Sequence, residues 1–303
     1  MEVLHWLESI RNPFLDTLIG LITQLGEDLV FTVVIIGTLW CLDKRAGFWM
    51  FFSWGLGTGV NQLVKAVCKI PRPWVRDPSL KAVESAIPAA TGYSFPSGHT
   101  QSVIGLFGSL AVFARKWAVT IVSLVLILLT GFSRLYLGVH TPADVLCAFA
   151  IGFVVVMLMR WFASLEEKFP WITRLASVIL ISVSAALLLY AVIDGGGEEK
   201  MLHAAENGWK MLGASIGLSA AWELDKKVLH FETGAVWYVQ IVKFLVGILG
   251  ALAIQAGLKQ PLLSLFSGSY VAHGVRYLLL TVFAGILYPL TFGWWAKLGK
   301  KEK

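Results

Sequence analysis

The sequence predicts an all-α protein, a polytopic bundle of transmembrane helices. Of its 303 residues, 57% are hydrophobic and only 15% are charged, which is more apolar than soluble globular proteins normally are. The apolar residues gather in long runs, most of them near the ~20 residues that a helix needs to cross a bilayer. Most basic residues stand in the short loops between these runs, as expected for a chain oriented in a membrane.

The N-terminal segment, residues 1–27, differs from these runs because charged residues interrupt it. Glu8, Arg11 and Asp16 are spaced so that one face of a helix stays apolar. We therefore expect an amphipathic helix that lies at the membrane interface. A further, poorly formed span is the alternative.

Nine apolar runs of about membrane-spanning length follow this segment. They cover residues 28–42, 46–68, 99–114, 117–133, 143–162, 172–193, 209–223, 235–258 and 274–296. The five runs within residues 28–170 form a core, and the N-terminal segment of residues 1–27 leads into it. The four runs within residues 171–303 form additional membrane helices, for which no motif indicates a role.

The basic residues indicate how the chain is oriented. Basic clusters fall in alternate loops, at Lys44 and Arg45, at Arg115 and Lys116, within 160–174, at Lys226 and Lys227, and in the tail 297–303. The positive-inside rule makes the face that they share cytoplasmic, so the net charge of +6 calls for no nucleic-acid partner. We expect an integral protein of a bacterial cytoplasmic membrane. The three cysteines show neither metal-ligand spacing nor a disulfide framework.

Three polar clusters fall in the loops of the opposite face, at the periplasm or exterior. One follows the second run, one opens the third run, and one joins the fourth run to the fifth. Because these ends lie on the same side of the membrane, the clusters can meet in one site. Their candidate residues are Lys65 and Arg72, then Ser97, Gly98 and His99, then Arg134, His140 and Asp144.

The composition of this site indicates that it binds an anion. Lys65, Arg72 and Arg134 supply three cations, and each cation without a partner costs about 3 kcal/mol near the membrane centre. A phosphate monoester carries about −1.5 to −2 charges and suits the forked donors of arginine. Ser97 and Gly98 can add hydroxyl and backbone N–H donors at the start of a helix.

The two histidines extend this binding site to a reaction site. His140 and Asp144 are four residues apart and share one face of a helix, so the carboxylate can orient the imidazole as a nucleophile toward phosphorus. His99 has no carboxylate at that spacing and is free to protonate the leaving oxygen. Water would then hydrolyse a phosphohistidine intermediate.

Two other chemistries fit the same residues less well. Ser97 and His99 stand two positions apart on a helix and point in different directions, which disfavours a serine nucleophile with a histidine base. His99, His140 and Asp144 could form a facial triad for a metal ion, but three neighbouring cations would repel it. We therefore expect neither a metal nor another cofactor.

The spacing of these residues resembles that of the type 2 phosphatidic acid phosphatases. Three segments carry the resemblance: Lys65, six residues, Arg72-Pro73; then Pro96-Ser97-Gly98-His99; then Ser133-Arg134, five residues, His140, three residues, Asp144. The resemblance implies phosphate binding by Lys65, Arg72, Ser97, Gly98 and Arg134, with His140 as nucleophile, His99 as general acid and Asp144 as its orienting carboxylate. It also implies a metal-independent reaction at the extracytoplasmic surface and a core of about six helices.

The sequence therefore predicts a membrane phosphatase that hydrolyses a lipid phosphate or pyrophosphate. Phosphatidic acid, phosphatidylglycerol phosphate and undecaprenyl pyrophosphate all allow the tail to stay in the bilayer while the headgroup enters the site. A phosphatase for a soluble ester such as a sugar phosphate, or a lipid-phosphate transporter or flippase, are the alternatives. Membrane lipids are expected partners, and self-association into a homodimer stays open.

Overall fold

The chain forms one elongated helical bundle, seen in a computed structural model that describes residues 1–194 and 199–298. These residues contain no β-strand, which confirms the predicted all-α class. The helices of the N-terminal half are α1 (Glu2–Ser9), α2 (Pro13–Thr23), α3 (Asp28–Gly37), α4 (Lys44–Cys68), α5 (Pro73–Arg76), α6 (Gly98–Val103), α7 (Ser109–Ala114), α8 (Trp117–Tyr136) and α9 (Pro142–Leu165). Those of the C-terminal half are α10 (Ile172–Ile193), α11 (Glu199–Leu224), α12 (Trp237–Gly257), α13 (Lys259–Leu265), α14 (Val271–Val282) and α15 (Phe292–Trp295).

All nine apolar runs of the sequence fall on helices, but these helices differ in hydropathy. Five spans, Trp117–Tyr136, Pro142–Leu165, Ile172–Ile193, Trp237–Leu265 and Val271–Trp295, are long and apolar enough to cross a membrane. A sixth forms if Pro13–Gly26 and Asp28–Leu42, which meet at a bend of 50°, count as one broken span. The helices α4 and α11 are as long as these spans, with 25 and 26 residues. They are less apolar because both carry polar side chains into the interior.

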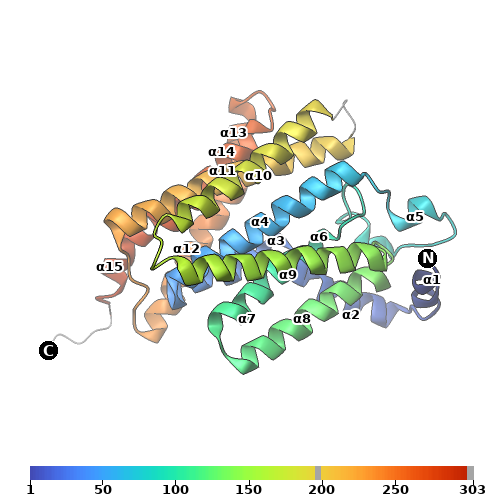
Figure 1. Cartoon of the computed structure of the whole chain (residues 1–303), viewed down its shortest axis with the longest axis horizontal. Helices are drawn as coiled ribbons and strands as arrows, with labels where there is room; N and C mark the ends of the chain where they lie inside the picture. The colour runs from blue at the N-terminus through green and yellow to red at the C-terminus, as the bar shows by residue number, and fades with distance from the viewer. Residues whose placement is uncertain (195–198, 299–303) are drawn as a thin grey trace.

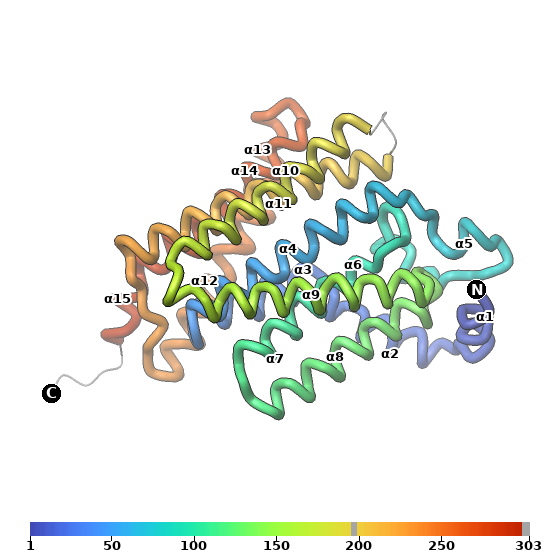
Figure 2. The backbone as a smooth tube through the Cα atoms, viewed as in Figure 1, coloured from blue at the N-terminus to red at the C-terminus, as the bar shows by residue number. Residues whose placement is uncertain are grey.

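The helix α4 occupies the centre of the bundle. It packs against α9 and α6 on one side and against α10 and α11 on the other (Figures 1 and 2). Asp43 caps its first turn by accepting a hydrogen bond from the backbone N–H of Ala46 at 3.0 Å. Lys69 ends it in the left-handed conformation, with φ of 50°. The outer end of α4 therefore has a fixed position, which matters because Lys65 lies in its last turn.

The N-terminal segment forms two helices where the sequence predicts one. Asn12 caps α2 through the backbone N–H of Leu15 (3.0 Å), and Pro13 occupies its first position. Two of the charged residues that were expected to face the interface instead attach this segment to the end of α8. Arg11 donates to the carbonyl of Tyr136 at 2.9 Å, and the Tyr136 hydroxyl donates to Asp16 at 2.8 Å. The predicted placement of residues 1–27 at the membrane interface stays a prediction.

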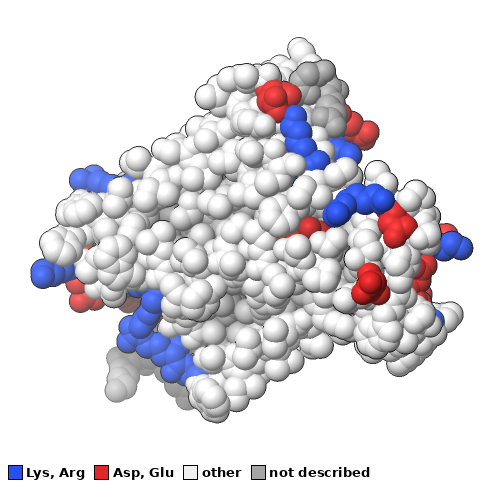
Figure 3. Space-filling view, turned by 45° about the vertical axis from the view of Figure 1, so that its right-hand side comes forward, with Lys and Arg blue, Asp and Glu red and all other residues white. Residues whose placement is uncertain are grey.

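Charged side chains gather at the two ends of the molecule, with a broad uncharged band between them (Figure 3). At one end the predicted cytoplasmic loops meet, because Glu166 pairs with both Arg45 (2.9 Å) and Lys226 (3.0 Å). Lys44 pairs with Asp225 at 2.9 Å at the same end. The alternating basic loops are thus brought together as span counting predicts, although residues 299–303 of the basic tail lie outside the described residues. The opposite end holds the polar clusters.

Candidate active site

The three polar clusters meet at the end of the bundle opposite the basic loops. Lys65 comes from α4, Arg72 from the loop after it, and Arg134 from the last turn of α8. Ser97 caps α6, and Asp144 lies in the first turn of α9. Lys65, Arg72, Arg134, Ser97, His140 and Asp144 are all buried, none with more than 8% of its surface exposed. The structure thus brings together residues that are up to about 80 positions apart in the sequence.

His140 and Asp144 form a hydrogen-bonded pair in the order that their spacing predicts. The imidazole Nδ1 lies 3.3 Å from Asp144 Oδ2. The same carboxylate oxygen accepts from the Ser94 hydroxyl at 2.6 Å and from the backbone N–H of Thr141 at 2.8 Å. Three donors therefore fix the carboxylate, which in turn fixes the imidazole ring. With its proton on Nδ1, the ring keeps the lone pair on Nε2, and this atom lies 2.9 Å from a guanidinium nitrogen of Arg72.

The surroundings of His140 favour its neutral form. Burial lowers the pKa of His140 well below its usual value of 6.5, the hydrogen bond to Asp144 opposes this, and Arg72 and Arg134 add to the lowering. At neutral pH the imidazole is therefore uncharged, with an unprotonated nitrogen. An uncharged imidazole is the form that can attack phosphorus.

Backbone carbonyls hold Arg72 in place. Its guanidinium donates to the carbonyl oxygens of Gly92 (3.2 Å), Thr91 (2.6 Å) and Val139 (3.1 Å). Burial lowers the pKa of Arg72 to about 10, so the side chain stays charged at neutral pH. It is a fixed cation beside Nε2 of His140.

Arg134 and Lys65 are both buried, and neither forms a salt bridge within the described part of the chain. One nitrogen of the Arg134 guanidinium donates to the Thr23 hydroxyl at 2.5 Å, while Nε and Nη2 are buried and have no partner in residues 1–194 or 199–298. The Lys65 ammonium likewise has no acceptor within that part of the chain. Buried N–H groups without acceptors cost free energy, more so when they are charged. The donors of this site therefore suit an anionic ligand.

The start of α6 lies against these cations. The sequence predicts that Ser97 and Gly98 offer donors to a phosphate here, and for the backbone N–H of Ser97 the structure differs. The backbone N–H of Ser97 donates to the Asp144 carbonyl at 3.0 Å, and the Ser97 hydroxyl accepts from the Thr100 hydroxyl at 2.9 Å. The Ser97 N–H is therefore not available to a ligand. A Cβ built on Gly98 would stand 3.9 Å from the Lys65 ammonium, which places the first N–H of the helix beside that cation.

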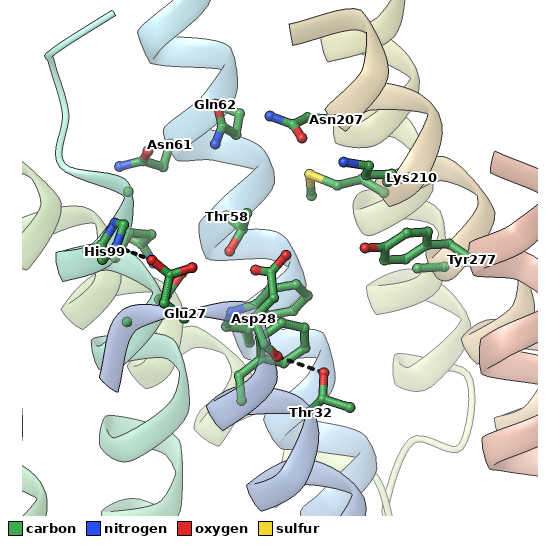
Figure 4. A pocket seen from close by; sticks show the side chains of 18 of the residues that line it. Glu27, Asp28, Thr32, Thr58, Asn61, Gln62, His99, Asn207, Lys210 and Tyr277 are labelled. Atoms are coloured by element: carbon green, nitrogen blue, oxygen red, sulfur yellow. Dashed lines mark hydrogen bonds and ion pairs between the residues drawn. The ribbon is translucent and has the colours of Figure 1, made fainter. Parts of the chain in front are cut away.

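His99 has a carboxylate partner that the sequence did not reveal. Its Nε2 lies 3.0 Å from Oε1 of Glu27, which stands at the bend between α2 and α3 (Figure 4). Gly26 permits this approach, because a Cβ there would come within 2.8 Å of the His99 Cβ. His99 indeed has no carboxylate four residues further along its own helix, but spacing along one helix cannot show a partner from another segment. The only sequence signal was an acidic residue directly before the first apolar run.

The facial triad considered from the sequence does not form. Within residues 1–194 and 199–298, no three His, Cys, Asp or Glu side chains stand together in a way that could hold a metal ion. His99 is instead paired with Glu27, and His140 with Asp144.

Comparisons with known proteins assign the two halves of the chain. Residues 46–168 match the PAP2 superfamily, and residues 209–301 match the transmembrane extension of PAP2 superfamily phosphatases. A phosphatidylglycerophosphatase B of Bacillus subtilis is 30% identical over 173 residues, which cover 53% of this chain and 81% of that protein. An undecaprenyl-diphosphatase of the same organism is 29% identical over 172 residues, covering 55% and 84%. A sphingosine-1-phosphate phosphatase 1 of Rattus norvegicus is 26% identical over 175 residues, covering 56% and 40%.

The comparison with solved structures found no match. The family match confirms the resemblance that the three motif segments indicated, and it favours an enzyme over the transporter alternative. The extension match covers most of α11 and the helices after it, for which no motif could be assigned, but it does not include α10. The chain belongs to the PAP2 superfamily and is a phosphoric ester hydrolase.

Proposed function

We propose that this protein hydrolyses the phosphate monoester or diphosphate of a membrane lipid through a phosphohistidine on His140. The observation that carries the proposal is the pair of buried Arg134 donors without an acceptor in the described part of the chain, in one site with the buried Lys65 and with the His140 nitrogen that faces Arg72. A phosphate in this place would accept from both side chains and from the start of α6. Its phosphorus would lie beside Nε2 of His140.

The reaction follows from the two histidine–carboxylate pairs. Nε2 of His140 attacks phosphorus as the bond from phosphorus to the leaving oxygen breaks. The Arg72 N–H that points at Nε2 turns to a phosphate oxygen and stabilises its growing charge. His99 gives its proton to the leaving oxygen. Burial and the charge of Arg134 oppose the protonated imidazole that this step needs, whereas Glu27 and the charge of a bound phosphate favour it. Water then attacks the phosphohistidine, returns a proton to His99 and releases inorganic phosphate.

The lipid substrate is supported by the relatives and by the position of the site. The names of the three relatives describe enzymes for an undecaprenyl diphosphate, a phosphatidylglycerophosphate and a sphingosine-1-phosphate. A site at the ends of membrane helices can receive such a headgroup without removing its tail from an apolar medium. By the positive-inside rule, the basic loops at the other end of the bundle support a site that faces away from the cytoplasm.

Replacing the nucleophile gives the first test. We expect His140→Ala to lower phosphate release from lipid substrates by at least about a thousandfold, because no other described imidazole pairs with Asp144. The parent, quenched in alkali during turnover, should carry base-stable, acid-labile phosphate, and His140→Ala should carry none. His230→Asn is the control, since His230 belongs to the loop after α11 at the opposite end. Phosphate release by His140→Ala at the parent rate would rule out the nucleophile.

The protonation of His140 gives a second test. Because burial lowers its pKa, the neutral imidazole should persist as the pH falls from 7 through 6.5, and the proton should bind only at lower pH. Nitrogen NMR of histidine-labelled protein in detergent, assigned with His140→Ala, measures this directly. A His140 signal that is already that of an imidazolium at pH 7 would contradict the account.

The role of Glu27 can be separated from a purely structural one. We expect Glu27→Gln to lower kcat on alkyl phosphates about 10- to 100-fold, because an amide favours the protonated His99 less than a carboxylate does. With p-nitrophenyl phosphate, whose leaving group needs little protonation, the loss should nearly vanish. Glu84→Gln, an exposed change in the loop of the same end, should affect neither substrate. An equal loss on both substrates would show that Glu27 does not act through the acid.

A further inference from the structure

The phosphate-binding residues stand at one end of a long cavity. This cavity, of about 300 Å³, runs between α3 and α4 on one side and α11 and α14 on the other. Along α4 it is lined at every third or fourth residue, by Phe48, Phe51, Trp54, Thr58, Asn61 and Lys65. Lys65 stands 17 positions after Phe48, which corresponds to about 25 Å of helix at about 1.5 Å per position. The cavity is therefore a channel along most of α4.

The lining of this channel changes with depth from charged and polar residues, which include Asp28 and Lys210 beside Thr58, to apolar ones. Lys65, Arg134 and His140 line its outer end. Below them, Trp54 Nε1, Thr58 Oγ1, Asn61 Oδ1 and both polar atoms of the Gln101 amide are buried without a hydrogen-bond partner in the described part of the chain. Deeper still, the walls are apolar, with Phe31, Ile35, Leu39, Leu218 and Ala284. This order is that of an amphiphile, with a phosphate, a polar linker and a hydrocarbon chain.

Two helices of the C-terminal extension complete the channel. Asn207 and Lys210 project from α11 toward Gln62 and Thr58 of α4 at the polar level (Figure 4). Lys210 is held there by Glu206 at 2.6 Å. One and two turns further along α11, Ala214 and Leu218 line the apolar part. The extension therefore forms a wall of the same cavity that contains the reacting groups.

Near the inner end of the channel, where Leu39 and Ala284 line it, the core and the extension contact each other directly. The Trp40 indole N–H donates to the carbonyl of Ala284 at 2.7 Å, and the Trp40 ring lies 4.7 Å from that of Tyr288. The Lys243 ammonium donates to the Trp40 carbonyl at 2.9 Å. These contacts limit how deep a molecule bound at the phosphate site could extend into the channel.

We propose that this channel binds one long hydrocarbon chain of the lipid substrate, inserted tail first between the core and the extension. This rests on the proposed function, because the phosphate of the same molecule would occupy the site of Arg134 and Lys65. Thr58, Asn61 and Gln101 would contact the polar linker. The length of about 25 Å includes the levels of the phosphate and the linker, so the hydrocarbon chain would occupy the deeper part of the channel, between Trp54 and Phe48 of α4.

Alkyl phosphates of different length test this proposal with one headgroup. We compare hexadecyl phosphate with octyl phosphate in the same detergent and take the ratio of their kcat/KM values. Ala214→Trp fills the apolar part of the channel and should lower this ratio about tenfold or more. Ile216→Trp is the matched control, because Ile216 lies on the same helix and is 43% exposed on the outer surface. It should leave the ratio at the parent value.

A smaller substitution tests whether the channel is occupied, and this test needs no measurement of enzyme activity. In Ala214→Cys, the rate at which N-ethylmaleimide alkylates the introduced thiol is followed by mass spectrometry. Hexadecylphosphonate should slow this alkylation about tenfold, octylphosphonate should have little effect, and Ile216→Cys should respond to neither. If Ala214→Trp does not fold, this result alone decides the proposal.

The outcomes separate this proposal from the function on which it rests. A parent that releases phosphate from neither alkyl phosphate contradicts the proposed function. A parent that hydrolyses both, with an unchanged ratio in Ala214→Trp and no protection by hexadecylphosphonate, overturns the channel proposal and leaves the lipid phosphatase in place.

Discussion

Uncompensated positive charge at one end of a membrane bundle is the constraint on which the structure depends. Three buried cations lie within one site, and the only carboxylate among the motif residues, Asp144, is already engaged by three donors. Burial of charge without a partner is costly in any protein and more so in a membrane. The negative charge of a bound phosphate would offset the free-energy cost of burying these cations. The catalytic proposal and the amphiphile channel both follow from this requirement.

The surrounding segments keep this charge in place. Backbone carbonyls of the loops at residues 91–92 and 139 hold Arg72, and Thr23 of the N-terminal segment holds Arg134. Glu27 from the same segment reaches His99. The first helices are thus part of the site, which explains why their polar residues face α8 and the motifs. The extension has the corresponding role below the site, where it encloses the channel.

The sequence was sufficient for the helical class and for the meeting of three motif segments, because periodicity, loop charge and span counting need only local information. It also paired His140 with Asp144, since both stand on one helix turn. It did not reveal Glu27, Thr23 or Ser94, which reach the site from segments whose approach depends on tertiary packing. Tertiary packing also explains why α4 and α11 are less apolar than the other long helices. Polar residues such as Asn61 and Asn207 line an internal cavity. Periodicity alone cannot distinguish a position that faces such a cavity from one that faces the membrane.

The most direct test of the central claim is the thermal stability of Arg134→Met, measured in detergent with and without orthovanadate as a phosphate mimic. If the Arg134 charge is retained for the ligand, removing it should leave the melting temperature of the ligand-free protein equal or higher. The rise that vanadate causes in the parent should then be lost. A variant that melts at lower temperature without ligand, yet is stabilised by vanadate as much as the parent, would contradict the account.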